Sequence, residues 1–121
     1  MSQPTALVIE DDDTLATIFS RALQLADYRA EIIADGEEAL RRLEELTPEL
    51  VVLDMHLPQV SGMQILSAIR QSDHLAQTRL IIATADSGLA AMLHQQADLV
   101  LVKPVSFHQL RRFANRLRPQ P

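Results

Sequence analysis

Five short apolar segments recur along the chain, and most of them are continuous runs of aliphatic residues. They are TALVI (5–9), AEIIA (30–34), LVVL (50–53), RLIIA (79–83) and LVLV (99–102). A continuous apolar run of this length is typical of a strand that is covered on both faces, as in a parallel sheet. The pattern therefore predicts five strands.

Amphipathic helical patterns fill the segments between these runs. Over residues 14–26 one stripe at helical spacing contains Leu15, Ile18, Phe19, Ala22 and Leu25. A second helix is predicted over 36–46, with Asp35 as its N-cap. A third is predicted to start at Ser61, and a fifth to run from about Ser106 to Leu117. The fourth, DSGLAAMLHQQ (86–96), should be short because it contains an early glycine.

Strand and helix alternate five times, which is the sequence form of a doubly wound α/β fold with one parallel sheet and helices on both faces. The length of 121 residues suits one domain over residues 1–121, with 118–121 as a tail or the start of a linker. In such sheets ligands bind outside the carboxyl ends of the strands. The candidate chemistry should therefore lie where the strands end.

Polar residues follow four of the predicted strands at the point where each strand ends. EDDD (10–13) follows the first strand, Asp54 the third, Thr84 the fourth and Lys103 the fifth. Because the carboxyl ends of parallel strands share one edge of the sheet, we expect these side chains to gather there. The sequence thus predicts a site with several carboxylates, one hydroxyl and one ammonium group.

Carboxylates crowded at one edge repel one another, which raises some of their pKa values unless a cation is bound. Mg²⁺ relieves this repulsion, since it takes carboxylate oxygens, a carbonyl oxygen and waters as ligands. The hydroxyl of Thr84 and the ammonium of Lys103 are not needed for a metal, but they suit a tetrahedral oxyanion beside it. The pattern predicts a phosphoryl site.

Most of these residues also have a purely structural interpretation. Asp12 and Asp13 fit best as the start of the first helix, where acids cap the helix and complement its dipole. Asp54 could begin a turn, Thr84 could be a helix cap, and Lys103 could be a solvated side chain. Their occurrence together at one sheet edge favours the phosphoryl site.

Composition and charge narrow the function classes further. The formal net charge of −5 argues against non-specific nucleic-acid binding, and the basic segment RRFANRLR (111–118) is typical of a solvated helix face. The chain contains no cysteine, which excludes disulfides and thiolate chemistry. We find no apolar run long enough to span a membrane and no signal peptide pattern, so a cytoplasmic protein is expected.

Four pieces of the chain resemble the receiver domains of two-component response regulators, in order and at close to the usual spacing. They are Glu10 with Asp11, LDMHLPQVSG (53–62), ATA (83–85) and VKP (102–104). The resemblance covers nearly the whole chain. It implies a flavodoxin-like strand order 2-1-3-4-5.

The resemblance also implies a role for each matching residue. Asp54 is similar to the phosphoacceptor, and Glu10 and Asp11 to the acids that bind Mg²⁺ together with it. The backbone carbonyl of His56 would be a further metal ligand.

The two remaining positions are implied to contact the phosphoryl group. Thr84 is similar to the hydroxyl that binds it, and Lys103 to the lysine that pairs with it. Such a protein is not an enzyme in the usual sense, although it promotes its own phosphorylation and dephosphorylation.

The expected partners follow from the same resemblance. A histidine kinase or a phosphotransfer protein would supply the phosphoryl group, and output would pass to an effector protein, because no effector domain follows the last predicted helix. The resemblance also allows a homodimer that depends on phosphorylation. No direct contact with nucleic acid or a membrane is expected.

Two departures from the family pattern concern output rather than chemistry. Three residues before Lys103 the family usually carries an aromatic residue, and this chain has Val100. The segment between Thr84 and Lys103 is also a few residues shorter than usual. The chemical site is intact, but the usual output surface is in doubt.

Three other functions would require different residues or a different use of the same fold. An aspartyl-phosphate phosphatase would need an acid two residues after the nucleophile, where this chain has His56. A flavodoxin-like mononucleotide carrier would not place EDDD beside a phosphate. The remaining alternative is a receiver-like interaction module that acts independently of phosphorylation, because a fold does not determine its function.

Overall fold

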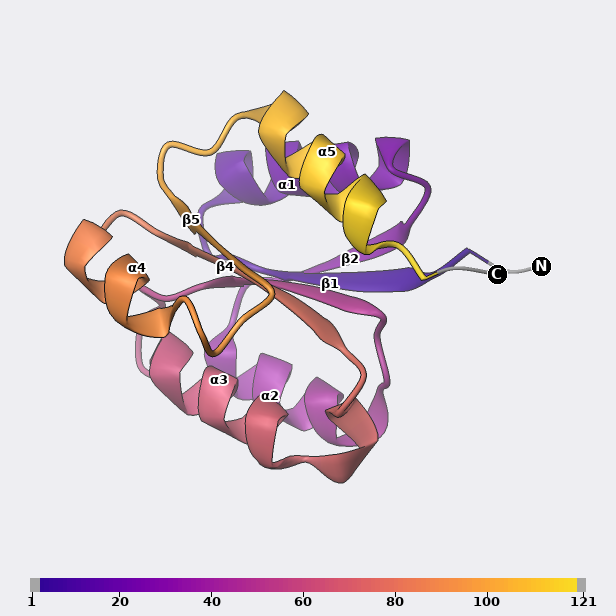
Figure 1. Ribbon diagram of the computed structural model, residues 1–121. Helices are drawn as coiled ribbons and strands as arrows, with labels where there is room; N and C mark the ends of the chain where they lie inside the picture. The colour runs from indigo at the N-terminus through magenta and orange to yellow at the C-terminus, as the bar shows by residue number, and fades with distance from the viewer. Residues whose placement is uncertain (1–2, 120–121) are drawn as a thin grey trace.

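Five parallel strands form one sheet in the order β2-β1-β3-β4-β5, as predicted (Figure 1). The computed structural model describes residues 3–119, so part of the predicted tail, residues 120 and 121, lies outside the described residues. The strands are β1 (Thr5–Ile9), β2 (Arg29–Ile33), β3 (Leu50–Asp54), β4 (Arg79–Thr84) and β5 (Leu99–Val102). Their bounds agree with the apolar segments of the sequence to within one residue at either end.

Helices cover both faces of the sheet (Figure 1). One face carries α1 (Asp13–Leu25) and α5 (Phe107–Leu117), and the other carries α2 (Gly36–Glu45), α3 (Gly62–Gln71) and α4 (Ser87–Leu93). A short 3-10 turn (Asp73–Leu75) follows α3. Each face has its own cluster of buried apolar residues, so the sheet lies between two cores. Within residues 3–119, no helix has both the length and the apolar character needed to cross a membrane.

The central and edge strands of the sheet are not equally buried. β3 lies at the centre and all five of its residues are buried, including Asp54 at its end. β2 and β5 lie at the edges, where Ile32 is 42% exposed and Val102 is 46% exposed. A strand at the edge of a sheet has a neighbour on one side alone, which leaves part of its surface open.

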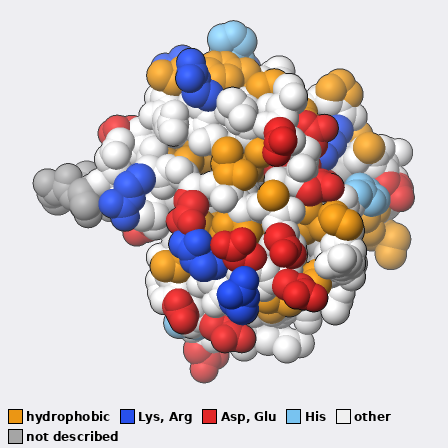
Figure 2. Space-filling view, turned by 180° about the vertical axis from the view of Figure 1, so that it is seen from behind, with side chains coloured by type: hydrophobic (Ala, Val, Ile, Leu, Met, Phe, Trp, Pro, Cys, Tyr) orange, Lys and Arg blue, Asp and Glu red, His pale blue; other side chains and the backbone are white. Residues whose placement is uncertain are grey.

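The exposed surface around β2 and α2 carries paired charges. Arg42 forms ion pairs with Glu31 at 2.6 Å and with Glu38 at 4.0 Å. Figure 2 shows acidic and basic side chains mixed on the lower half of the molecule when it is seen from behind. Such pairs contribute little stability at a surface, and this face is a solvated one.

The buried face of helix α1 includes Phe19 and Ala22 of the predicted apolar stripe, but it is rotated away from the stripe's other edge. Ile18 is 36% exposed and Leu25 is 56% exposed, whereas Ser20 and Leu23 are buried. Successive residues on a helix are rotated by about 100° around its axis, so the five positions of the apolar stripe spread over a wide arc. The buried face covers one part of this arc and leaves the rest open to solvent. Alanines on the buried side, among them Ala22, allow α1 to approach β2 and α5 closely.

The helices begin where side-chain caps fix them. Asp35 accepts a hydrogen bond from the Glu37 backbone N–H and caps α2, as predicted. Asp12 accepts one from the Leu15 N–H and caps α1, with Asp13 in the first turn, which confirms the predicted helix start for both residues. These caps let each helix start a few residues after its strand, which keeps the loops at the strand ends short.

Candidate functional site

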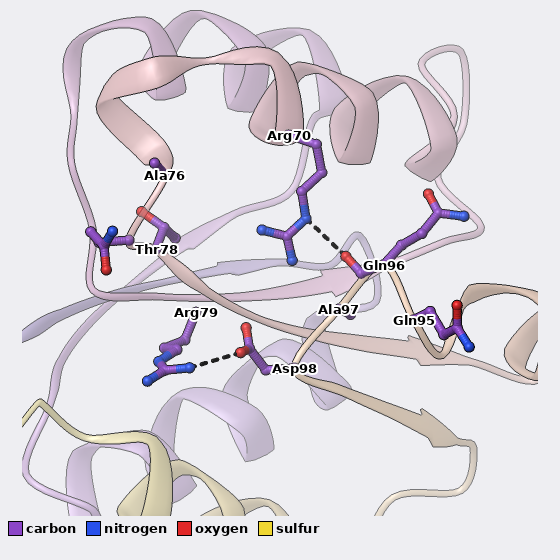
Figure 3. A pocket seen from close by; sticks show the side chains of 9 residues that line it. Arg70, Ala76, Thr78, Arg79, Gln95, Gln96, Ala97 and Asp98 are labelled. Carbon is purple, nitrogen blue, oxygen red and sulfur yellow. Dashed lines mark hydrogen bonds and ion pairs between the residues drawn. The ribbon is translucent and has the colours of Figure 1, made fainter.

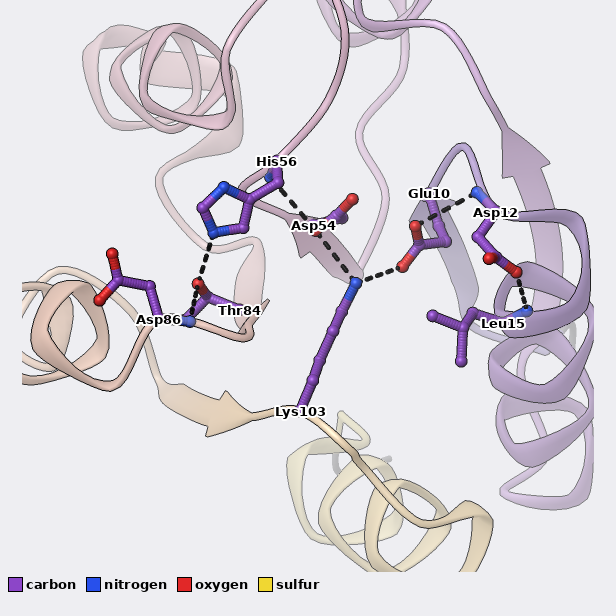
Figure 4. Close-up of polar contacts among 8 residues, drawn as sticks. All are labelled: Glu10, Asp12, Leu15, Asp54, His56, Thr84, Asp86 and Lys103. Carbon is purple, nitrogen blue, oxygen red and sulfur yellow. Dashed lines mark hydrogen bonds and ion pairs between the residues drawn. The ribbon is translucent and has the colours of Figure 1, made fainter.

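The predicted polar residues gather at the carboxyl edge of the sheet (Figure 4). Glu10 follows β1, Asp54 ends β3 and Thr84 ends β4, and these three are 2%, 3% and 0% exposed respectively. Lys103 follows β5, and its side chain extends toward Asp54 and Glu10. Buried polar groups need partners, so the contacts among these residues determine what the site can do.

Lys103 connects two of the buried carboxylates. Its Nζ lies 3.1 Å from Oε1 of Glu10 and 3.2 Å from Oδ1 of Asp54. The lysine is not adjacent to either acid in the sheet, because β4 separates β5 from β3 and β3 separates β4 from β1. The long, flexible side chain of lysine is what allows one ammonium group to reach both.

Burial and mutual contacts change the pKa values of Glu10 and Lys103. Burial raises the pKa of Glu10 from 4.5 to about 7. The hydrogen bond from Lys103 lowers this pKa, but burial outweighs it, and the negative charge of Asp54 acts in the same direction as burial. Burial works against the charge of Lys103, but its hydrogen bond to Glu10 and the charge of Asp54 together raise the pKa of its ammonium. Lys103 is therefore positively charged at neutral pH, and Glu10 is close to its midpoint.

Three carboxylates are close enough to share one cation. Glu10, Asp11 and Asp54 each offer an oxygen, and these oxygens all lie within 4.8 Å of one another. Glu10 and Asp54 are buried while Asp11 is exposed, so the cluster opens to solvent on the Asp11 side. Three carboxylates opposite one ammonium leave an excess of negative charge, and the all-oxygen donor set suits a hard divalent cation.

One oxygen of Asp54 is held in place and the other is available. The backbone N–H of His56 donates to Oδ1 at 3.2 Å, and Lys103 donates to the same atom. Among residues 3–119, no hydrogen bond engages Oδ2 of Asp54. A carboxylate that is anchored through one oxygen can present the other to a reacting group in a fixed direction.

Thr84 has contacts that the sequence did not predict. Its Oγ1 lies 2.9 Å from Nε2 of His56 and accepts a hydrogen bond from the Asp86 N–H at 3.0 Å (Figure 4). The cap of α4 is Asp86, which accepts from the Leu89 N–H, so Thr84 is not the helix cap. The family resemblance implied a role for the backbone carbonyl of His56 alone, and the contact of its ring with Thr84 was not predicted.

The loop between β3 and α3 is fixed against the strand by Gly62. A Cβ atom at this position would lie 2.5 Å from Cα of Met55, closer than two carbon atoms can approach. The Gly62 N–H donates to the carbonyl of Met55 at 3.3 Å. The loop that carries His56 is thus held by close backbone packing beside Asp54.

A separate polar cavity of about 510 Å³ lies at the opposite edge of the sheet (Figure 3). It is near the amino ends of β4 and β5, where Arg70 donates to the Gln96 carbonyl at 2.8 Å and Arg79 pairs with Asp98 at 3.0 Å. These arginines already have partners. The cavity lies away from the carboxyl edge and is not part of the acidic site.

The sequence of the chain is similar to those of known proteins. The family model described as the response regulator receiver domain matches residues 6–115. The transcriptional regulatory protein AfsQ1 of Streptomyces coelicolor is 36% identical over 102 residues, which cover 84% of this chain and 45% of that protein. The response regulator ArlR of Staphylococcus saprophyticus is 34% identical, with 95% of this chain and 53% of that protein covered.

A solved structure has the same fold. The response regulator TrrA of Thermotoga maritima, solved in complex with Mg²⁺ and BeF, has a TM-score of 0.82 and 28% identity, and the match covers 97% of this chain and 99% of that one. The chain spans about half the length of the first curated relatives that it matches.

Proposed function

Because this chain belongs to the response regulator receiver family, we propose that Asp54 is the residue that accepts a phosphoryl group. The chain is a receiver domain of two-component signal transduction, and a receiver domain is not an enzyme in the usual sense. The single observation that best supports Asp54 is its position between Lys103 and the acidic cluster, with Oδ1 anchored and Oδ2 available.

The transfer itself is a displacement at phosphorus. Oδ2 of Asp54 attacks the phosphorus atom of the donor, a new P–O bond forms, and the bond from phosphorus to the donor's leaving group breaks, with its electron pair going to that group. The backbone N–H of His56 and the ammonium of Lys103 hold Oδ1 during this step. Positioning and charge neutralisation govern such reactions, and this site offers both.

We propose that Mg²⁺ is the cation of the acidic cluster. Its ligands would be the carboxylates of Glu10, Asp11 and Asp54 and the backbone carbonyl of His56. The ion would neutralise the negative charge that Asp54 and an anionic donor bring together. Glu10 must be ionised to act as a ligand, so its raised pKa makes metal binding depend on pH near neutrality.

Lys103 and Thr84 complete the proposed site. Lys103 is poised beside Asp54, so its ammonium can pair with an oxygen of the phosphoryl group as a point charge. Thr84 ends the neighbouring strand, and its hydroxyl would donate to another phosphoryl oxygen. The two residues would reach the phosphoryl group from β4 and β5, whereas the acids follow β1 on the other side of β3.

A receiver domain implies a histidine kinase as the source of the phosphoryl group. We propose that this chain receives it either directly or through a phosphotransfer protein, that residues 1–121 form a single domain, and that output passes to an effector protein or to a second copy of the chain. We also propose a cytoplasmic location, where such kinases act.

The proposal can be tested with beryllofluoride, which stands in for the phosphoryl group. In the presence of Mg²⁺, the wild-type protein should bind beryllofluoride and show amide shifts in the loops around residues 54–62 and 84–86. Asp54→Asn should show neither, because it lacks the carboxylate that beryllium binds. If wild type and Asp54→Asn behave alike, the chain is instead a receiver-like interaction module that acts without phosphorylation.

A further inference from the structure

The ring of His56 lies against the hydroxyl of Thr84, and we propose that it holds this hydroxyl away from Asp54 in the unphosphorylated protein. The inference rests on the proposed function, since it concerns the hydroxyl that would bind the phosphoryl group. His56 is then a positioning residue that acts through Thr84. Its side chain has this role in addition to the backbone N–H that donates to Asp54.

The direction of the hydrogen bond follows from the burial of Thr84. The side chain is fully buried, and two polar contacts involve its Oγ1 among the described residues. One is the N–H of Asp86, which can act as a donor alone. The hydroxyl hydrogen therefore has one acceptor, Nε2 of His56, because a buried donor without a partner is costly.

The direction of this hydrogen bond determines the tautomer of the His56 ring. If Nε2 accepts the hydroxyl hydrogen, the proton of the neutral ring must be on Nδ1. His56 is exposed, so Nδ1 can donate to solvent while Nε2 remains bound to Thr84. The three groups (Asp86 N–H, Thr84 hydroxyl and His56 ring) thus form a continuous chain of hydrogen bonds in the resting protein.

The Thr84 hydroxyl cannot donate to His56 and to a phosphoryl oxygen at the same time. A hydroxyl has one hydrogen, so donation to a phosphoryl oxygen requires that the bond to His56 break. The ring is therefore a competing acceptor, and it lowers the affinity of the site for a phosphoryl group. Breaking a neutral hydrogen bond of this kind changes an equilibrium by about two- to tenfold.

The hydrogen bond can be tested in the protein without metal or phosphoryl group. Nitrogen-15 spectra of the histidine rings should show that the neutral ring of His56 carries its proton on Nδ1 and that Nε2 is unprotonated. Thr84→Val, which replaces the hydroxyl by a methyl group, should shift the Nε2 resonance of His56 and reduce this preference. A His56 spectrum that Thr84→Val leaves unchanged would overturn the proposal, whatever the outcome of phosphorylation.

The competition is tested by beryllofluoride affinity at saturating Mg²⁺. His56→Leu should bind about two- to tenfold more tightly than wild type. His56→Gln, whose side-chain carbonyl can still accept from Thr84, should restore an affinity near that of wild type. The matched control is His94→Leu, the same change at an exposed histidine at the end of α4, which should have no effect.

A double-mutant cycle separates this role from a general structural one. In the Thr84→Val background His56→Leu should no longer change the affinity, because the hydroxyl is already absent. Unchanged affinity in His56→Leu alone contradicts the proposal, and weaker affinity assigns the ring to a direct contact with the phosphoryl group instead. If wild type does not bind beryllofluoride, the proposed function fails, and the ring spectra still decide whether His56 holds Thr84.

Discussion

Nζ of Lys103 lies 3.1 Å from Oε1 of Glu10, although the two residues are 93 positions apart in the chain. The contact crosses the end of β3, and it encloses Asp54 between the first and the last strand of the fold. The same ammonium stabilises both buried acids when no cation is bound. A cation bound by the acids would replace the ammonium of Lys103 as the partner of the carboxylates. An oxyanion beside Lys103 would replace the carboxylates as the partner of its ammonium.

The first prediction concerns pH and Glu10. Burial raises the pKa of Glu10 to about 7 in the folded protein, above its ordinary value of 4.5. The folded protein therefore binds more protons than the unfolded one between these values, and its free energy of unfolding should fall as pH rises through this window. In a chelating buffer this loss should reach roughly 2.4 kcal/mol, measured by urea unfolding between about pH 5 and pH 7.5.

Glu10→Gln is the control for this pH dependence. The amide is neutral at every pH, so the slope contributed by Glu10 should disappear, and the variant should be more stable than wild type near pH 7.5. Stability curves of wild type and Glu10→Gln that run parallel from pH 5 to pH 7.5 would show that Glu10 keeps its ordinary pKa.

The second prediction concerns the metal. If Mg²⁺ binds the folded state and not the unfolded state, it should raise the free energy of unfolding. The increase should be about 1.4 kcal/mol when the free Mg²⁺ concentration is ten times the dissociation constant. Asp11→Asn should weaken this effect and leave the metal-free protein equally stable or more stable, because a repulsive charge is removed. The measurement is the melting temperature as a function of Mg²⁺ concentration.

Asp13→Asn is the matched control for Asp11→Asn. Asp13 is an acid in the first turn of α1 and is not part of the carboxylate cluster. It should keep the full response to Mg²⁺. Equal responses in the two variants would mean that general screening of negative charge, rather than a bound ion, stabilises the protein.

The third prediction concerns the packing of the loop beside Asp54. Gly62→Ala places a Cβ atom against the backbone of Met55 and should cost about 1–3 kcal/mol of stability, measured by urea unfolding. Gly88→Ala is a matched change at the start of α4, where the nearest atom, Oδ1 of Asp86, is 3.3 Å away. This side-chain oxygen needs to shift by only a few tenths of an ångström, and alanine is the better helix former, so Gly88→Ala should cost much less than Gly62→Ala. An equal loss of stability in Gly62→Ala and Gly88→Ala would contradict the close packing of the loop against the Met55 backbone.

The fourth prediction concerns output. Val100 is half-buried against the apolar core near α4, and it has neither a ring to rotate nor a polar group to change partners. A modification shifts a conformational equilibrium only through a difference in free energy between the two states. Beryllofluoride should therefore cause large amide shifts at residues 54–62 and 84–92 and small ones at residues 98–114. Comparable shifts in the two regions would contradict this.

The sequence predicted the strands, their carboxyl ends and the polar residues that meet there. This was possible because apolar runs mark buried strands, and parallel strands in one sheet end at the same edge. Asp54 and Thr84 both end strands that are paired with each other, so their proximity follows from the topology. Lys103 follows the edge strand, and no pattern in the sequence indicates that its side chain reaches Glu10 as well as Asp54.

Other features depend on orientation, which the sequence does not determine. The rotation of α1 is set by packing against β2 and α5, so Ile18 and Leu25 are exposed although they belong to the apolar stripe. The ring of His56 points to Thr84 because of the local path of a loop. A histidine two residues after Asp54, near a hydroxyl on the next strand, is a signal that could have suggested this contact.

The central claim is that Asp54 accepts one phosphoryl group, and intact mass spectrometry tests it most directly. The protein is incubated with a small-molecule phosphodonor and Mg²⁺, with a chelator-treated sample and Asp54→Asn beside it. We predict that the wild-type mass increases by one phosphoryl group with Mg²⁺, and that neither the chelated sample nor Asp54→Asn changes. A wild-type mass that does not increase, or an equal increase in Asp54→Asn, would contradict the assignment of Asp54.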